Sequence, residues 1–333
     1  MVRKLSQYRS QIMGLMILWV IIFHFSFKIS NPVLLVLKAC GYCGVDAFIF
    51  LSGMGQYCSL HHNSSLKHFF RNRFKRILPT FYPILLLWMI YVLLTDRPHF
   101  ILGFIMSNIT GQAFWNNMIP RFDWYMEAIW VFYGSAPLIA YLLNLPKKRY
   151  ICMAFLFSLL IGSVFRSSFP LVAVARLPIF IIGMGVGQLL CEGREISRMQ
   201  EACLYLLSAA GLTILGFFAF FLPGTLWDLG TAWYPFILIM PGFLVLLCHL
   251  FHFFQNHRCL SYINQLLGAC GRITLELYLI HVFFFSGIGQ NNWITLALSL
   301  ALAFPYHYAI QKITSWYSRK FTDAAVFMPK EGL

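Results

Sequence analysis

The scarcest feature of this 333-residue chain is charge. Only 11% of its residues are charged and only eleven residues are acidic, whereas an average soluble domain carries about 25% charged residues. So few polar groups cannot cover a globule of this size, which excludes an ordinary soluble domain. Hydrophobic residues make up 59% of the chain, so we expect lipid to cover most of its surface.

Two further absences simplify the organisation of the chain. No stretch rich in glycine, serine or proline separates two halves, and no tandem repeat is visible, so we predict a single domain over residues 1–333. The nine cysteines lie mostly within apolar runs, where a thiol packs as a small hydrophobe. Only Cys40 and Cys43 have a metal-like spacing, and a lone pair without partner ligands is a poor metal signal. We therefore expect no metal site.

Long apolar runs recur along the whole chain. Runs of roughly 20 residues are each long enough to cross a ~30 Å hydrocarbon layer as a helix. The sequence therefore predicts an all-α polytopic membrane protein, a multi-pass protein of the cell membrane with about ten transmembrane helices. The predicted spans are Ser10–Phe27, Ala39–Leu60, Pro79–Thr95, Trp124–Leu143, 150–165, 170–191, 203–222, 233–254, 267–287 and 291–311.

The formal net charge of +14 is concentrated in short segments between the apolar runs, such as Leu66–Arg76 and Lys147–Arg149. Lysine and arginine mark cytoplasmic loops, so we predict that both termini are cytoplasmic. Placing all basic segments on one side leaves Phe100–Arg121 as an outer-face or re-entrant element rather than a span. Because membrane topology accounts for the positive charge, no nucleic-acid partner is expected.

Four ionisable residues inside the predicted spans form a candidate site. An ionisable side chain in a bilayer costs several kcal/mol unless it faces a cavity or a partner, so it indicates function. His24 and His281 lie about 21 Å above the inner ends of their spans, and Asp46 and Glu127 lie about 10 Å and about 5 Å below the outer face. We expect these four side chains to gather in the outer half of the membrane.

Structural explanations compete with this prediction for some residues. A buried histidine often only hydrogen-bonds a carbonyl of a neighbouring helix. For His281 this structural role and a functional role are equally consistent with the sequence. For His24 we favour a catalytic role. Glu276 follows Arg272 by one helical turn, which predicts an intrahelical ion pair. His307, in the final span, is interpreted as structural.

Arginines gather at the predicted inner mouth. Arg9 precedes the first span, and Arg73 and Arg76, three residues apart, project from one face of a helix start. A cytoplasmic location explains basic residues in general but does not explain why they are arginines rather than lysines. Arginine binds phosphate oxygens better, because its planar guanidinium can donate two hydrogen bonds at once. The pattern therefore predicts a phosphate-rich ligand at the inner face.

Six segments, in order along the chain, resemble signatures of the membrane acyltransferase 3 family. The likeness runs from residue 8 to about residue 283 and combines an arginine and a histidine in the first segment with an Arg-x-x-Arg stretch in the third. The segments are "YRSQIMGLMILWVIIFHF", "GVDAFIFLSGM", "FFRNRFKRILPTFYP", "DWYMEAIWVFYGSAPL", "RLPIFIIGMGVG" and "GRITLELYLIHVF".

The resemblance implies an integral membrane O-acyltransferase. Such an enzyme moves an acyl group, here expected to be acetyl, from cytoplasmic acyl-CoA (acetyl-CoA) to a hydroxyl of an extracytoplasmic cell-surface polysaccharide or glycolipid. By this likeness His24 matches the catalytic histidine, and Arg9, Arg73 and Arg76 match functional arginines. Many relatives carry an acid soon after the first arginine, where this chain has "SQ", and some carry two adjacent histidines instead of one.

The residues and the resemblance together suggest a mechanism. The arginines would hold the nucleotide phosphates of acyl-CoA, and its arm would reach up a continuous passage to His24. His24 would act as a general base on the acceptor hydroxyl, or would carry the acyl group covalently. Asp46 or Glu127 would fix the tautomer of its ring. Residues expected to line the acceptor entrance are Trp124, Tyr125, Tyr278 and His281.

A transporter or flippase of a polysaccharide or lipid-linked sugar is the alternative, because it would use the same arginines and buried acids. Transporters commonly contain internal repeats and broken helices at matching positions. The sequence has no such symmetry, which favours the acyltransferase.

Overall fold

A computed structural model describes residues 1–26, 29–96, 101–285 and 293–326. Phe27, residues 286–287 and residues 291–292, at the ends of three predicted spans, lie outside these ranges. Secondary structure within the described ranges is helical, without strands. Its helices are α1 (Val2–Gln7), α2 (Arg9–His24), α3 (Pro32–Ala39), η1 (Cys40–Cys43), α4 (Gly44–His62), α5 (Leu66–Thr95), α6 (Leu102–Thr110), α7 (Tyr125–Asn144), α8 (Arg149–Leu160), η3 (Ile161–Phe165), α9 (Leu171–Val174), α10 (Leu177–Cys191), α11 (Arg198–Phe221), α12 (Thr225–Asp228), α13 (Phe236–Gln255), α14 (Arg258–Arg272), α15 (Thr274–Phe283) and α16 (Trp293–Val326).

Many of these helices are long and apolar enough to cross a membrane. Seven qualify within the described residues, and α14 with α15 makes an eighth if this bent pair counts as one span; α2 and the segment Arg149–Phe165 are shorter apolar helices. The all-helical, multi-pass membrane architecture is confirmed. The number ten and the cytoplasmic termini stay predictions. The seven helices are Pro32–His62, Leu66–Thr95, Tyr125–Asn144, Leu171–Cys191, Arg198–Phe221, Phe236–Gln255 and Trp293–Ser315.

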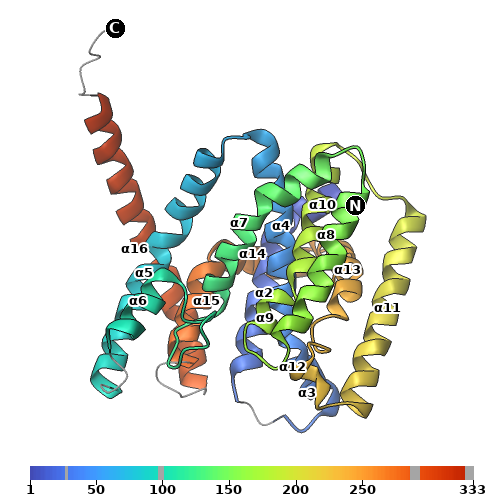
Figure 1. The fold of residues 1–333 in the computed structure, drawn as a ribbon, viewed down its shortest axis with the longest axis horizontal. Helices are drawn as coiled ribbons and strands as arrows, with labels where there is room; N and C mark the ends of the chain where they lie inside the picture. Colours follow the sequence, from blue (N-terminus) through green and yellow to red (C-terminus); the bar gives the residue numbers. More distant parts are fainter. Residues whose placement is uncertain (27–28, 97–100, 286–292, 327–333) are drawn as a thin grey trace.

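The long helices stand side by side as an upright bundle, with α16 and α11 at opposite edges (Figure 1). The connections α4–α5, α7–α8 and α10–α11 all lie at the upper side in this view. These connections contain or adjoin the basic segments. Their position on one side of the bundle agrees with the rule that basic loops lie on one side of the membrane. The helix α6 has nine residues, about 14 Å of rise, too little to cross a bilayer.

Two helices at the centre of the bundle, α4 and α10, pack backbone against backbone. A Cβ atom added to Gly183 would lie 2.1 Å from the carbonyl oxygen of Phe50, and one added to Gly53 would lie 2.5 Å from that of Phe180. Small residues allow this close approach, which is a main source of helix–helix packing in a bilayer, where there is no hydrophobic drive between helices. This contact fixes α4, which carries Asp46, against the segment that carries Arg176.

A sharp break divides the chain between α14 and α15, which are bent by 69° at Ile273. The break overturns the predicted ion pair between Arg272 and Glu276, because residues four apart share a face only in an uninterrupted helix. Arg272 is exposed at the end of α14, and Glu276 instead pairs with His307, with Nδ1 2.8 Å from Oε1.

Substituting the contact glycine tests the packing of α4 and α10. Gly183→Ala is expected to lower the thermal unfolding midpoint in detergent, because overpacking costs about 1–3 kcal/mol, more than the ~1 kcal/mol that alanine gains in helix propensity. Gly185→Ala on the same helix is the control, since its Cβ would meet nothing within 4 Å. Equal unfolding midpoints for the two variants would contradict the proposed close contact.

Candidate active site

An aromatic cavity of about 300 Å³ opens beside His24. It lies at the end of α2 opposite to Arg9, and its walls come from α2, η1, α4, α9, α12 and α15 and from the loops before α7, α10 and α13. Apart from His24, Arg121, Asp123 and Arg176, its lining is apolar or aromatic. We call it the outer cavity; its lining residues are Val20, Phe23, His24, Tyr42, Val45, Arg121, Phe122, Asp123, Trp124, Phe169, Val172, Arg176, Trp227, Trp233, Tyr278, Val282 and Phe285.

Hydrogen bonds define the tautomer of His24. Its Nδ1 lies 3.0 Å from the carbonyl oxygen of Val20 and 3.3 Å from Nε2 of His281. A carbonyl oxygen only accepts, so Nδ1 of His24 carries the proton. Nδ1 of His281 likewise lies 3.2 Å from the carbonyl oxygen of Leu277, so its unprotonated Nε2 is a second acceptor, which shares the single Nδ1–H of His24 with the carbonyl oxygen of Val20. The remaining nitrogen, Nε2 of His24, is then unprotonated and is a base.

Asp46 is not the residue that orients His24, contrary to expectation. Both carboxylate oxygens of this fully buried residue face Arg176, with Oδ1 3.0 Å from Nε and Oδ2 3.3 Å from Nη2. Arg176 is itself buried and donates Nη1 to the carbonyl oxygen of Val172. A bidentate guanidinium matches both oxygens of a carboxylate better than one imidazole does, so the acid pairs with arginine.

The same guanidinium supports the aromatic wall of the outer cavity. The Cζ atom of Arg176 lies 5.4 Å from the ring centroid of Trp124 and 5.6 Å from that of Trp233. Contacts at this distance are favourable cation–π interactions. The Asp46–Arg176 pair therefore positions two tryptophans that line the cavity. Arg176 was missed in the sequence although it lies inside the predicted span 170–191, where the rule that singled out His24 applies equally.

Glu127 also lies apart from His24. Its Oε2 accepts a hydrogen bond from the backbone N–H of Phe114 at 2.7 Å. It lines a separate cavity of about 470 Å³ between α5, α6 and α7. Glu127 sits in the first turn of α7 and faces the loop that precedes this helix, which depth alone could not predict. Within the described residues Glu127 thus lines a different cavity from His24, and no hydrogen bond joins it to either histidine.

Breaking the buried ion pair is expected to destabilise the protein strongly. Asp46→Ala leaves an unpaired charge in the interior, which costs about 3–5 kcal/mol, and the thermal midpoint in detergent should fall accordingly. Glu192→Ala is the matched control, because its partner Arg194 is 68% exposed and such pairs contribute about 0–1 kcal/mol. An equally small effect of both substitutions would show that the buried pair does not hold the fold.

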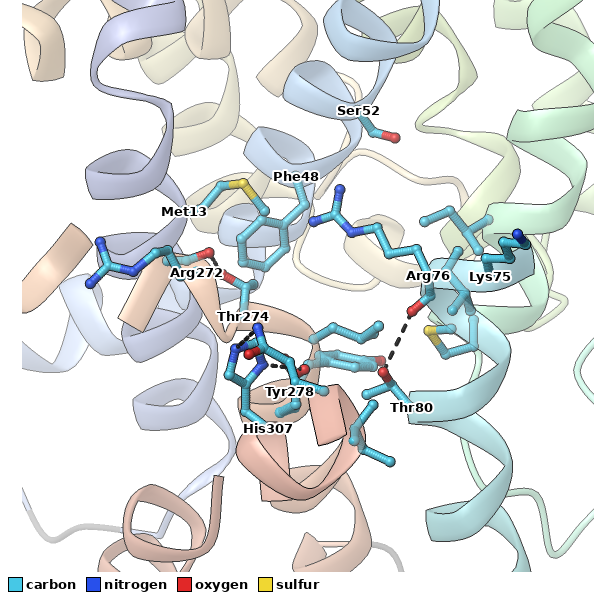
Figure 2. A pocket seen from close by; sticks show the side chains of 18 of the residues that line it. Met13, Phe48, Ser52, Lys75, Arg76, Thr80, Arg272, Thr274, Tyr278 and His307 are labelled. Carbon is cyan, nitrogen blue, oxygen red and sulfur yellow. Dashed lines mark hydrogen bonds and ion pairs between the residues drawn. The ribbon is translucent and has the colours of Figure 1, made fainter. Parts of the chain in front are cut away.

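A larger cavity of about 630 Å³ lies on the basic side of the bundle. Figure 2 shows Arg76 reaching from α5 into this space toward Phe48 and Ser52 of α4, with Lys75 beside it. We call it the inner cavity; its lining residues are Arg9, Met13, Phe48, Ser52, Lys75, Arg76, Ile77, Thr80, Tyr125, Met126, Ile129, Tyr133, Gly271, Arg272, Thr274, Leu275, Glu276, Tyr278, His307, Ile310, Gln311, Thr314 and Ser315.

The predicted arginines gather around the inner cavity, but not in one role. Arg9 and Arg76 line it, and Nε of Arg9 is buried without a hydrogen-bond partner among the described residues. Arg73 lies within electrostatic range of Arg9, yet its Nε donates to Oε1 of Gln56 at 2.8 Å and it does not line the cavity. Two of the three arginines are thus available to an anion.

An acid–histidine pair forms another part of this wall. Glu276 and His307 interact as described above, and Nε2 of His307 lies 2.8 Å from Nε2 of Gln311 (Figure 2). The structural interpretation of His307 fits this pairing, but the pair also borders the cavity. The sequence gives no signal for it, because the partners are 31 residues apart on helices whose rotation is set by tertiary packing.

Within the described residues the expected passage is divided into two separate cavities. The outer cavity contains His24 and the inner cavity contains the arginines, and within the described residues only Tyr278 borders both. The residues expected at an acceptor entrance are divided accordingly. Trp124 lines the outer cavity and Tyr125 the inner one, whereas His281 is fully buried behind His24.

No group of three or more metal-binding side chains exists within the part of the chain that the structure describes. Cys40 and Cys43 are free thiols on the short helix η1.

Comparison with known proteins supplies one match. A family model described as an acyltransferase domain, of the acyltransferase 3 type, matches residues 13–311, which is nearly the whole chain and includes most of the lining of both cavities, although Arg9 precedes it. No curated protein and no solved structure matches the chain.

Proposed function

The chain belongs to the acyltransferase 3 family, and we propose that it moves an acyl group, acetyl in the simplest case, from cytoplasmic acyl-CoA to a hydroxyl of a cell-surface polysaccharide or glycolipid. Membership of the family makes it a membrane acyltransferase. The donor, the acceptor and the location in the cell membrane are our proposal. The observation that carries it is His24 in the lining of an aromatic cavity, with its Nδ1 next to the carbonyl oxygen of Val20 and Nε2 of His281, and a separate cavity lined by arginines.

The inner cavity suits the donor. Coenzyme A carries several phosphates, and arginine binds phosphate through charge-assisted hydrogen bonds. Arg76 is exposed at the cavity, and Nε of Arg9 is a buried donor without a partner in the part of the chain that the structure describes. A buried unsatisfied donor is costly, so a ligand oxygen there would stabilise the site. We assign Arg9 and Arg76 to the phosphates, and Arg73 to a supporting charge behind them.

His24 then performs the proton transfer. Its Nε2 takes the proton of the acceptor hydroxyl, and the hydroxyl oxygen attacks the thioester carbonyl carbon. The C–S bond breaks, and the proton passes from His24 to the departing thiolate. The imidazolium formed in between is stabilised by His281, whose Nε2 accepts from Nδ1–H of His24 at 3.3 Å, as a carboxylate does in a His–carboxylate pair. A covalent acyl-histidine at the same nitrogen is the alternative route.

The outer cavity suits a carbohydrate acceptor. Binding pockets combine apolar and aromatic walls with a few fixed polar groups, and the three tryptophans here, Trp124, Trp227 and Trp233, provide flat faces for a sugar ring. Arg121, which is only partly buried in this lining, is the polar group that can orient hydroxyls. The transporter alternative draws no support from the family match or from the structure, because the match concerns acyl transfer.

Substitution of the histidines tests the chemistry. His24→Ala is expected to lower kcat for transfer by about 10²–10⁴-fold, the usual contribution of a general base, while binding of acyl-CoA persists. His281→Gln should retain more activity than His281→Phe, because the amide oxygen can still accept from Nδ1–H of His24. Transfer of labelled acetyl to glycan in purified membranes measures both effects. Unchanged transfer in His24→Ala would refute the assignment.

A second test concerns the donor. Arg76→Ala is expected to raise KM for acyl-CoA by about tenfold or more, because a hydrogen bond to a charged group contributes roughly 1.5–3 kcal/mol. Arg71→Ala is the control on the same helix, since Arg71 is exposed and does not line the inner cavity. Steady-state kinetics with varied acyl-CoA distinguishes them. A KM that responds equally to both substitutions would mean that only general positive charge matters.

A further inference from the structure

Tyr278 occupies a place that the mechanism has not used. Within the described residues it alone borders both the inner and the outer cavity. Its side chain is buried, and its ring lies against Tyr125, with centroids 5.2 Å apart and planes at 62°. This ring therefore lies at the border between the cavity proposed to hold the thioester and the cavity that contains His24.

The hydroxyl of Tyr278 is held by an acid that has no other role in the proposed reaction. It donates a hydrogen bond to Oδ1 of Asp123. Asp123 is fixed in turn by the start of α7, because Oδ1 accepts from the backbone N–H of Tyr125 at 3.1 Å and Oδ2 from that of Met126 at 2.6 Å. A helix N-terminus stabilises a carboxylate through these N–H groups and its dipole, so Asp123 is a rigid anchor.

A movement of Tyr278 would change the surroundings of the proposed general base, His24. Tyr278 and His281 are three residues apart on α15, so they lie on one face of the helix, and their ring centroids are 5.3 Å apart. The ten-residue helix α15 begins at the 69° break, which leaves its first turn outside the preceding helix. Displacement of the Tyr278 ring is thereby linked, through His281, to the position of His24.

We propose that Tyr278 is a gate between the donor and acceptor cavities and that Asp123 is the positioning residue that latches it closed. This inference rests on the proposed function. The closed gate keeps water of the outer cavity from the thioester, and the acyl-bearing arm opens it by displacing the ring. Without the latch, water competes with the acceptor: a C–O bond forms from water to the carbonyl carbon, the C–S bond breaks, and the thiol and the free carboxylic acid are released.

The test is the ratio of acyl-CoA hydrolysis without acceptor to acyl transfer with acceptor, measured on the full-length protein in detergent. Tyr278→Phe keeps the ring and removes the latch, and the ratio is expected to rise about tenfold, the effect of losing a hydrogen bond to a charged group. Tyr57→Phe is the matched control, because it also removes a buried tyrosine hydrogen bond between two helices, that to Oδ1 of Asn144 at 2.6 Å.

A ratio that stays unchanged in Tyr278→Phe, or that rises equally in Tyr57→Phe, overturns the gate. If Tyr278→Phe does not fold, Asp123→Asn is measured instead; it keeps an oxygen for the N–H groups of α7 but weakens the latch, and it should raise the ratio in the same direction. A wild-type protein that neither hydrolyses nor transfers the acyl group refutes the proposed function itself, which is a different result from an unchanged ratio.

Discussion

The arrangement of the site depends on one buried ion pair. A charge inside a bilayer is tolerated only when a partner neutralises it, and the Asp46–Arg176 pair meets this requirement with two hydrogen bonds. The pair ties α4 to the residues just before α10 and places the guanidinium within 5.6 Å of the ring centroids of both Trp124 and Trp233. The close backbone contact at Gly183 holds the same two segments in register. An apolar substitute would fill the space but would not orient the aromatic wall.

Transfer of a group between two compartments needs an opening to each side and a barrier between them. The inner cavity provides arginine and lysine, and the outer cavity provides an imidazole among aromatic rings. Their common border is formed by the short helix α15, which carries Tyr278 and His281. The 69° break before α15 gives this short helix an orientation different from that of α14, so that its residues can border both cavities. The residue at the border of the two cavities and the hydrogen-bond partner of His24 thus come from one element.

The sequence predicts some parts of this site well because their signals are local. His24 is conspicuous as an imidazole in an apolar run, and Arg9 and Arg76 are conspicuous as arginines at a basic mouth; the structure places all three on cavity walls. His281 was expected near His24 and contacts it, but its role as the partner in place of Asp46 or Glu127 could not be predicted, because depth along a helix says nothing about the rotation of the helix. Asp46 and Glu127 have suitable depths but face Arg176 and the loop before α7.

Other features escaped because their signal is weak or was overlooked. The break at Ile273 follows no proline, so nothing in the sequence separated α14 from α15, and the expected Arg272–Glu276 pair failed for that reason. Asp123 looked like a loop residue just outside a span, and its hydrogen bond to Tyr278 joins residues 155 positions apart. Arg176, in contrast, was visible as a charge within a predicted span and deserved the same treatment as the histidines.

The most direct test of the central claim, that donor and acceptor meet from opposite sides, uses sealed vesicles that contain the protein in one known orientation. Acyl-CoA with a labelled acyl group is supplied on one side and a soluble glycan acceptor on the other. The account predicts labelled glycan when the donor is on the side of Arg76 and the acceptor on the side of His24, and almost none in the reverse arrangement. Equal labelling in both arrangements, or labelling only when donor and acceptor share the Arg76 side, would contradict it.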